Sequence, residues 1–445
     1  MMNNTNIKIS ISTLGCKVNQ CDSAAMEGSL RNCGYEIVLP SKKADVYIVN
    51  TCVVTKKTES QSRQLLRKYL RSSPDCQVIA VGCYAQKSAE DLKAVSKRVS
   101  VFGNSEKKDI GKYVKALLNH GQAKQQVSDI LLEKTFSTPA NPVFLDRTRA
   151  FLKVQDGCNS GCSYCIVPSV RGKSRSLPMP EFISRLHAFA DQGYLEVVLT
   201  GIHLGAYGLD LDPAANILEV LKQIEKDDKF SDMRIRLSSF EPGEFSDELI
   251  AFISDSKIIC PHVHIPLQSG DPDILKKMRR PYSPALFSGL TEKLFSAVPG
   301  LNMGIDVIVG FPGETDAHFN NTLEFLKQIP AAYLHVFPYS QREGTPAAEF
   351  DGQLPEPVKK ERVKILRALS DEKKEKFYET FIDQSLPVLV EAKRDKKTGA
   401  LRGFSRNYIP VIFNGDDDLI GKEILVKLND VCEDLVVGER VDGRV

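Results

Sequence analysis

Three cysteines in the middle of the chain stand close enough together to bind one metal cluster. Cys158, Cys162 and Cys165 form the run CNSGCSYC, directly after a strand-like segment. Three thiolates on one short loop can hold three irons of a cubane [4Fe–4S] cluster, which leaves the fourth iron an open coordination site. Zinc is the alternative, but no histidine or fourth cysteine stands at zinc-finger spacing. The run therefore favours a catalytic iron–sulfur cluster.

A second set of cysteines is spread along the N-terminal part of the chain. Cys16, Cys52 and Cys83 each lie just beyond the end of a short, β-branched segment. The carboxyl ends of parallel strands share one edge of a sheet, so these side chains are expected to converge there. Gly15 and Gly82 directly precede two of them and permit tight loops. The alternative is three buried cysteines that only pack.

The composition is that of a globular protein with a large core. The 445 residues include 42% hydrophobic and 26% charged residues, with a net charge of +2 that neither requires nor excludes a nucleic-acid partner. No apolar run is long enough for a membrane helix, and MMNNTNIKIS does not resemble a secretory signal. We expect a cytoplasmic protein without membrane contact. Eleven cysteines in a reducing compartment indicate metal binding more than disulfides.

The pattern of strand-like and helix-like segments around the cysteines predicts an α/β chain in three parts. Strand-like and helix-like segments alternate in the first part, which predicts a small doubly wound parallel sheet. Six further β/α units follow, two fewer than a closed eight-fold barrel needs, so a partial, open (β/α)6 barrel is expected. The first part has strands expected at 7–13, 45–50 and 77–82 and helices near 20–33 and 57–72. The barrel strands are expected at 150–155, 195–200, 233–238, 262–267, 303–310 and 333–339.

After a charged helix at 355–380 the pattern changes to short strands with Gly and Asp turns: LPVLVE, IPVIF, EILVKL and ERVDGRV. This pattern predicts a small C-terminal β-barrel. We expect domain boundaries at 5–120, 144–377 and 378–445, with a polar linker at 121–143.

The motifs resemble those of the radical S-adenosylmethionine methylthiotransferases over essentially the whole chain. The resemblance rests on the C-x3-C-x2-C run and on TLGCKVNQ, NTCVVT, AVGCYAQ, RLSSFEP, HIPLQSG and GIDVIVGFPGETD. It implies that both cysteine triplets hold [4Fe–4S] clusters and that S-adenosylmethionine binds the open iron of the cluster at Cys158, Cys162 and Cys165. The last segments resemble the TRAM domain, a small barrel associated with RNA binding. Since both clusters must act on one substrate, the N-terminal sheet edge should face the mouth of the barrel.

Polar or aromatic residues near the cysteine run and the barrel strand ends are candidates for cofactor binding. Tyr164 fits the family position near the adenine of the cofactor. Glu241 is placed to bind a ribose hydroxyl, unless it is only a surface acid. His203 follows Thr200 at a strand end and faces either the cofactor or a structural partner. Gln268 could line the cofactor or substrate cavity.

Basic residues give a weaker indication of RNA binding. Such residues can position an anticodon stem-loop by contacting its phosphates, although a charged helix is more often merely solvated. The C-terminal barrel is not basic in bulk, so RNA binding by this barrel rests on analogy. The candidates are Arg63, Arg67, Arg171, Lys173, Arg279 and Lys393.

The resemblance implies methylthiolation of C2 of an adenosine at position 37 of tRNA, beside the anticodon. Lys17 and Val18 after Cys16 favour N6-threonylcarbamoyladenosine, because the isopentenyladenosine group usually has Gln-Met there and the ribosomal-protein group Pro-Lys. An electron donor such as flavodoxin or ferredoxin and a sulfur donor are implied as partners. Two rivals stay open: a two-cluster electron carrier or redox sensor, and an RNA-binding module with zinc in the cysteine sites.

Overall fold

The computed structural model describes residues 7–120, 126–137, 148–441 and 443, and its first part is a five-stranded parallel sheet. The strand order β2-β1-β3-β4-β5 confirms the predicted doubly wound arrangement. Alternate side chains of one strand face opposite ways, so Val46 and Ile48 join the core on one side while Tyr47 and Val49 join the other. The strands are β1 (Lys8–Thr13), β2 (Glu36–Val38), β3 (Val46–Thr51), β4 (Gln77–Gly82) and β5 (Val99–Val101).

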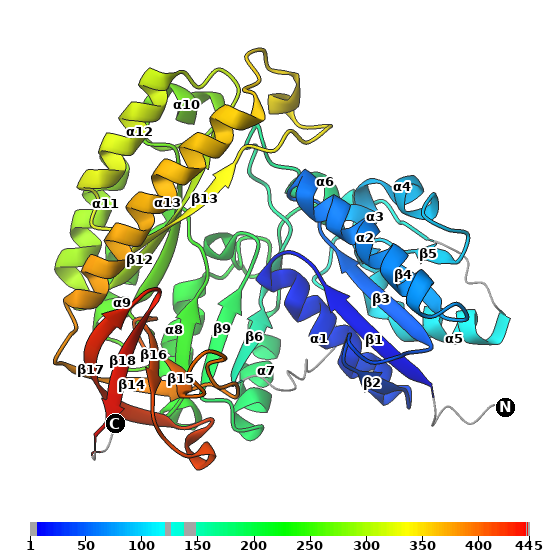
Figure 1. Cartoon of the computed structure of the whole chain (residues 1–445), viewed down its shortest axis with the longest axis horizontal. Coiled ribbons are helices and arrows are strands. Elements are labelled where there is room, and N and C mark those ends of the chain that lie inside the picture. The colour runs from blue at the N-terminus through cyan, green and yellow to red at the C-terminus, as the bar shows by residue number, and fades with distance from the viewer. Residues whose placement is uncertain (1–6, 121–125, 138–147, 442, 444–445) are drawn as a thin grey trace.

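Helices cover both faces of this sheet (Figure 1). Met26 and Leu30 of α1 and Val114 of α5 belong to the core on one face, and Leu66 and Tyr69 of α2 belong to the core on the other. The three-residue strands β2 and β5 escaped prediction because so short a segment carries no periodic signal. The helices are α1 (Lys17–Asn32), α2 (Lys56–Ser72), α3 (Cys83–Lys87), α4 (Ala89–Lys93) and α5 (Ile110–His120).

The central part is the expected open barrel of six parallel strands. It consists of two three-stranded sheets, β10-β9-β6 and β11-β12-β13, which a bridge between Ile235 and Ile259 joins. In the described structure β6 and β13 are the outer strands, and α1 of the N-terminal part lies beside β6 (Figure 1). The strands are β6 (Arg149–Lys153), β9 (Glu196–Thr200), β10 (Arg234–Leu237), β11 (His262–Gln268), β12 (Asn302–Val309) and β13 (Tyr333–Pro338).

Helices between and after these strands complete the barrel wall, and the long α13 lies along β13. Short strands β7 (Gln155–Asp156) and β8 (Arg175–Ser176) flank the central cysteine run. The helices are α6 (Val167–Arg171), α7 (Met179–Asp191), α8 (Ile217–Glu225), α9 (Asp247–Asp255), α10 (Pro272–Lys277), α11 (Pro284–Ala297), α12 (Asp316–Gln328) and α13 (Glu356–Glu379).

The C-terminal part is a closed five-stranded barrel, as predicted. One boundary was wrong: ERVDGRV was expected as the last strand, but β18 already ends at Arg440, and residues 442, 444 and 445 lie outside the described structure. The strand β15 was missed. The strands are β14 (Ser385–Val390), β15 (Leu401–Ser405), β16 (Pro410–Phe413), β17 (Glu423–Cys432) and β18 (Leu435–Arg440).

Part of the predicted linker, residues 126–137, is described and lies against the other parts of the chain. Ile130 in this segment is buried, and Gln126 forms a bridge with Phe102 at the end of the N-terminal sheet. Residues 121–125 and 138–143 of the linker lie outside the described structure. Among the described helices, none combines the length and apolar character that a membrane span requires.

Buried charges attach the small barrel to the central barrel. Arg234 is 1% exposed, and its guanidinium donates to Glu196 and Glu423, at 2.6 Å each, and to the backbone carbonyl of Phe404. Arg236 donates to Glu196 and to backbone carbonyls of the small barrel. The small barrel is therefore fixed to the wall of the central barrel.

We predict that Arg234→Ala lowers the free energy of unfolding by about 3–5 kcal/mol, because it leaves the carboxylate of Glu196 buried without one of its partners. Chemical denaturation followed by circular dichroism measures this change. Lys293→Ala is the control, since it removes an exposed ion pair with Asp247 and should leave stability unchanged. Equal effects of the two substitutions would contradict a structural role for the buried network.

Candidate active site

The N-terminal cysteines lie at one edge of the first sheet, on three neighbouring strands. Cys16 lies between β1 and α1, Cys52 follows β3, and Cys83 follows β4. Gly15 has a φ of +96°, and a Cβ atom there would lie 2.7 Å from the Cys52 sulfur. The loop of Cys16 can therefore approach Cys52 only because residue 15 lacks a side chain.

Among these three cysteines, Cys52 is the buried thiol whose ionisation its surroundings oppose. Burial raises the pKa of Cys52 to about 11, and the charges of Cys83 and Cys16 add to this rise. Negative charges on the three sulfurs therefore oppose one another, and bound cations would relieve this repulsion. An amide N–H of Asn104 points at the Cys83 sulfur at 3.6 Å. The donor set fits an iron cluster.

The second triplet lies on the loop between β7 and α6, where N–H groups surround the sulfurs. The backbone N–H of Ser160 donates to the Cys158 sulfur at 3.3 Å, and the Arg280 guanidinium donates to the Cys162 sulfur at 3.1 Å. Burial raises the pKa of Cys158, but hydrogen bonds from His203 and Ser160 outweigh burial, and the pKa falls below its ordinary value. This favours the thiolate form that binds iron.

The spacing of the sulfurs counts against a single zinc ion in either triplet. Sulfurs around one tetrahedral zinc lie about 3.8 Å apart, because Zn–S bonds are about 2.3 Å long. Within the described residues, neither triplet is among the groups whose ligand atoms all lie within 4.8 Å of one another. None of the six cysteines is in a disulfide. In the described structure the sulfurs of each triplet are therefore not gathered around a single-ion site.

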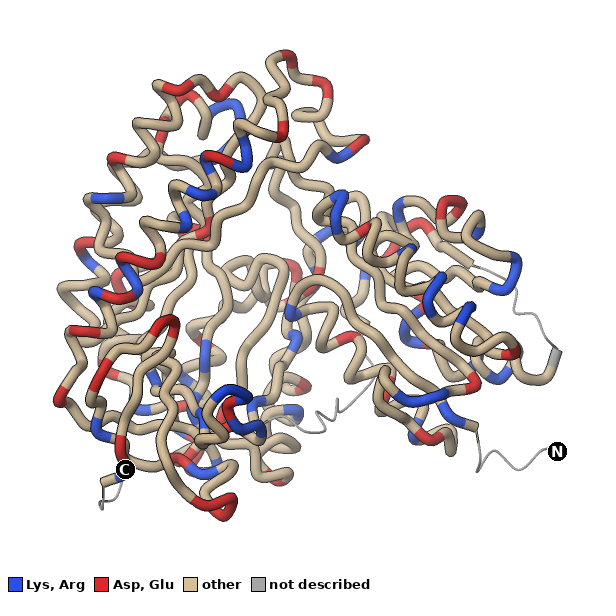
Figure 2. The backbone as a smooth tube through the Cα atoms, viewed as in Figure 1, with Lys and Arg blue, Asp and Glu red and all other residues tan. Residues whose placement is uncertain are grey.

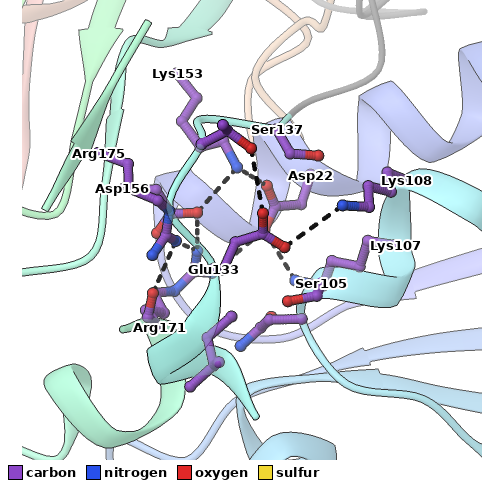
Figure 3. A pocket seen from close by; sticks show the side chains of 13 residues that line it. Asp22, Ser105, Lys107, Lys108, Glu133, Ser137, Lys153, Asp156, Arg171 and Arg175 are labelled. Carbon is purple, nitrogen blue, oxygen red and sulfur yellow. Dashed lines mark hydrogen bonds and ion pairs between the residues drawn. The ribbon is translucent and has the colours of Figure 1, made fainter. Parts of the chain in front are cut away.

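A network of buried charges joins the N-terminal part to the central barrel (Figure 3). Asp22 of α1 pairs with Lys153 at 2.6 Å, with Lys107 at 2.8 Å and with Arg171 at 3.3 Å. Asp156 pairs with Arg171 at 2.9 Å and with Lys153 at 3.1 Å. Burial alone would raise the pKa of Asp22, but the three cations hold it far below its ordinary value.

This network also connects the loops that carry the two triplets. The guanidinium of Arg171 donates to the side-chain oxygen of Asn19 at 2.6 Å. The amide of Asn19 in turn donates to the backbone carbonyls that precede Cys16 and Cys52, at 2.8 and 3.0 Å. On the other side, Asp156 accepts the backbone N–H of the residue before Cys158 at 2.8 Å. A single guanidinium thus sets the relative position of both loops.

The expectation that Arg171 contacts RNA is therefore wrong. Its side chain is 2% exposed and its charge is neutralised by Asp22 and Asp156. Arg63 is half-buried, with its guanidinium on the Tyr84 ring. The remaining candidates are exposed, and Lys and Arg recur along α2 (Figure 2): Arg67, Lys173, Arg279 and Lys393.

The predicted cofactor residues divide between the central cysteine loop and the barrel interior. The Nδ1 atom of His203 lies 3.7 Å from the Cys158 sulfur, and its Nε2 atom pairs with the carboxylate of Glu244. Burial lowers the pKa of His203, but these two partners raise it to about 10. Glu241 pairs with Arg280, and burial raises the pKa of Glu241. Tyr164 packs against an apolar cluster that includes Phe311. Gln268 ends β11 with a φ of +66°.

Arg280 and Glu244 were missed by the sequence reasoning. Arg280 directly follows Arg279, which was predicted to contact RNA, yet the guanidinium of Arg280 donates to Cys162, which lies 118 residues earlier. No local spacing reveals so distant a contact. Glu244 stands three residues after Glu241 and could have been suspected only as its neighbour.

A cavity of about 750 Å³ lies between the three parts of the chain. Cys16 and Lys17 line it from the N-terminal part, Thr200 and Asp306 from the central barrel, and Tyr408 from the small barrel. The N-terminal sheet edge thus faces the barrel interior, as a substrate shared by two clusters requires. Burial lowers the pKa of Lys17.

A hydrogen-bonded group of three side chains in this cavity was also missed. His264 and His335 each approach one oxygen of Asp306, at 3.3 and 3.5 Å. Burial raises the pKa of Asp306, but the two imidazoles outweigh burial and lower it. The residues stand on β11, β13 and β12, so only the strand register brings them together.

Two parts of the chain match known protein families. Residues 8–103 match the uncharacterized protein family UPF0004, and residues 152–326 match the radical SAM superfamily. The chain is 39% identical to the threonylcarbamoyladenosine tRNA methylthiotransferase MtaB of Bacillus subtilis, over 94% of this chain and 93% of that protein. It is 32% identical to the tRNA-2-methylthio-N(6)-dimethylallyladenosine synthase of Clostridium tetani, over 97% of this chain and 96% of that protein.

Among solved structures, the fold is similar to the radical S-adenosylmethionine methyltransferase TsrM from Kitasatospora setae, which has cobalamin and a [4Fe-4S] cluster bound. The two align over 77% of this chain and 74% of TsrM, with a TM-score of 0.56 and 13% identity. At this identity the likeness shows the fold alone.

We predict that Gly15→Ala reduces iron binding at the N-terminal triplet. The new methyl group would lie 2.7 Å from the Cys52 sulfur in a backbone conformation that alanine disfavours, so the loop of Cys16 must move away. Iron and sulfide analysis after anaerobic reconstitution measures the loss. Gly289→Ala is the control, because a Cβ at that position of α11 meets no atom within 4 Å. A full iron content in Gly15→Ala would contradict the prediction.

Proposed function

The chain belongs to the tRNA methylthiotransferase family, and we propose that it adds a methylthio group to C2 of N6-threonylcarbamoyladenosine at position 37 of tRNA. The observation that supports the proposal is the pair of cysteine triplets, whose loops one buried guanidinium connects. A cavity lies beside these loops, lined by Cys16 and by Val54 and Val167, which follow Cys52 and Cys165 by two residues. An electron carrier needs no such cavity beside its cysteine loops. The name of the Bacillus subtilis relative supports the threonylcarbamoyl substrate.

Each triplet is proposed to hold one [4Fe–4S] cluster, with Cys158, Cys162 and Cys165 holding the cluster that binds S-adenosylmethionine. When bound, these groups supply the one-electron chemistry and the sulfur that replacement of an unactivated aromatic C–H bond requires. Tyr164, Thr200, His203, Glu241 and Gln268 are proposed to bind the cofactor.

The chain's own residues position the reacting groups and tune the thiolates. Arg280 neutralises the sulfur of Cys162 and orients the carboxylate of Glu241. His203, held by Glu244, donates toward the sulfur of Cys158. N–H donors at the sulfurs of a cluster stabilise its negative charge and adjust its reduction potential.

The anticodon stem-loop of tRNA is the proposed partner, with Arg67, Lys173, Arg279, Lys393 and the partly buried Arg63 as proposed phosphate contacts. A flavodoxin or ferredoxin and a separate sulfur donor are proposed to supply electrons and sulfur, in the cytoplasm. The isopentenyl substrate is the second candidate, because relatives with the synthase name also match over nearly the whole chain.

Mass spectrometry of tRNA nucleosides tests the proposal. Cells that lack the activity are compared with and without expression of this chain. Appearance of 2-methylthio-N6-threonylcarbamoyladenosine with loss of its precursor is expected. A methylthio mark on isopentenyladenosine would reassign the substrate, and unchanged nucleosides would direct the search to a ribosomal protein aspartate.

Cysteine substitutions separate the roles of the two triplets. We predict that Cys162→Ala abolishes cleavage of S-adenosylmethionine to 5′-deoxyadenosine, because the cluster loses one of three ligands. Cys52→Ala is expected to spare this cleavage and to stop methylthiolation. Chromatography of 5′-deoxyadenosine and of nucleosides measures both reactions.

Cys432→Ser, an exposed cysteine at the end of β17, is the matched control and should retain both reactions. Methylthiolated product from Cys52→Ala would remove the N-terminal triplet from the proposed mechanism.

A further inference from the structure

Lys17 lines the central cavity, and its ammonium group has no ion-pair partner among the described residues. Lys17 follows Cys16 and begins α1, and its side chain lines the cavity. It makes no ion pair or hydrogen bond with any other residue in the part of the chain that the structure describes. The titratable groups that act on it are Tyr408, Arg236, Arg149 and Glu196, and Glu196 is already neutralised by the two arginines.

A second lysine in the same cavity shows the contrast. Lys374 of α13 also lines the cavity, but it pairs with Asp434 at 2.6 Å and with Asp371 at 3.3 Å. Lys17 is exposed, and its charge in this cavity is not balanced by a paired carboxylate, so it is available to an anion that binds beside it. Of the two lysines that line this cavity, Lys17 is therefore the one available to bind an anionic ligand.

Three buried polar atoms of the same cavity also have no hydrogen-bond partner among the described residues. They are the hydroxyl oxygen of Ser238, Nδ1 of His262 and the side-chain oxygen of Asn302. His262 and Asn302 are register partners on β11 and β12, and the bridge between Ile235 and Ile259 sets Ser238 beside His262. The other ring nitrogen of His262 is bound to the hydroxyl of Tyr333 at 2.9 Å.

These three atoms form one level of the barrel wall. His262 and Asn302 are only 3% and 2% exposed, so bulk water does not hydrogen-bond to these atoms. Buried polar atoms without partners are uncommon in proteins, and a cavity that offers several of them is suited to a polar ligand.

We propose that Lys17, Ser238, His262 and Asn302 form the subsite that receives the threonylcarbamoyl group of the substrate, with Lys17 pairing its carboxylate. This rests on the proposed function. The threonylcarbamoyl group carries a carboxylate, a hydroxyl and a urea, which match a cation and three hydrogen-bonding atoms. An isopentenyl group carries none of these and would leave all four side chains unpaired. A site built to bind polar groups rejects an analogue that lacks them.

Binding to anticodon stem-loop RNA tests the subsite apart from turnover. The probes are one RNA with N6-threonylcarbamoyladenosine, the same RNA with its threonyl carboxylate as a methyl ester, and the unmodified RNA. Fluorescence anisotropy is measured with the full-length protein carrying both clusters. Wild-type protein is expected to prefer the free carboxylate over the ester, and Lys17→Gln to lose this preference through about 10- to 100-fold weaker binding of the free acid.

Matched variants control the measurement. Lys17→Arg keeps the charge and is expected to keep part of the preference, and Lys374→Gln, which removes the paired cation, is expected to keep all of it. Binding of the unmodified RNA should be the same for every variant. Asn302→Ala is expected to weaken binding of both threonylcarbamoyl RNAs alike, since it does not contact the carboxylate.

Two outcomes overturn the inference at different levels. If wild-type protein forms the methylthiolated nucleoside while Lys17→Gln keeps the preference for the free carboxylate, the subsite is wrong and the proposed function stands. If the wild-type protein with both clusters does not modify threonylcarbamoyl RNA at all, the proposed function fails and the subsite fails with it.

Discussion

The contact between Asp22 and its three cations is the interaction on which the arrangement of the active site depends. Two carboxylates and three cations are enclosed where α1 meets the central barrel. Buried ion pairs add little net stability, because the loss of hydration offsets the attraction. Their contribution here is geometric, since each charge is satisfied only when α1 and β6 stand in one orientation. Asn19 transmits that orientation to the loops of Cys16 and Cys52.

A similar arrangement holds the opposite end of the same sheet. Glu196 and Arg234 attach the small barrel to β9 and β10, while Asp22 and Lys153 attach the N-terminal part to β6. The sheet β10-β9-β6 therefore acts as a common support for both neighbours. The cavity between them is shaped by three parts of the chain, and none of them could form it alone.

Much of the fold was accessible from the sequence because period and length are local properties. All six barrel strands and the long helix α13 lie where alternation of strand and helix predicted them. The convergence of Cys16, Cys52 and Cys83 followed from their places after parallel strands. The surroundings of charged residues were harder to predict. Arg171 stands among basic neighbours and suggested a surface, although its carboxylate partners are 15 and 149 residues away in sequence. Contacts between such distant residues depend on the packing of whole domains, which no local pattern encodes.

The small barrel is more than an appended module, because its loop forms part of the cavity. Tyr408 stacks on Phe404 with ring centroids 4.9 Å apart, lies under the guanidinium of Arg236 and borders the cavity. Replacing this barrel by an unrelated domain would remove part of the wall of the cavity. Substitutions in the three parts are therefore expected to depend on one another. Sequence changes that alter the substrate should occur in the small barrel as well as beside the clusters.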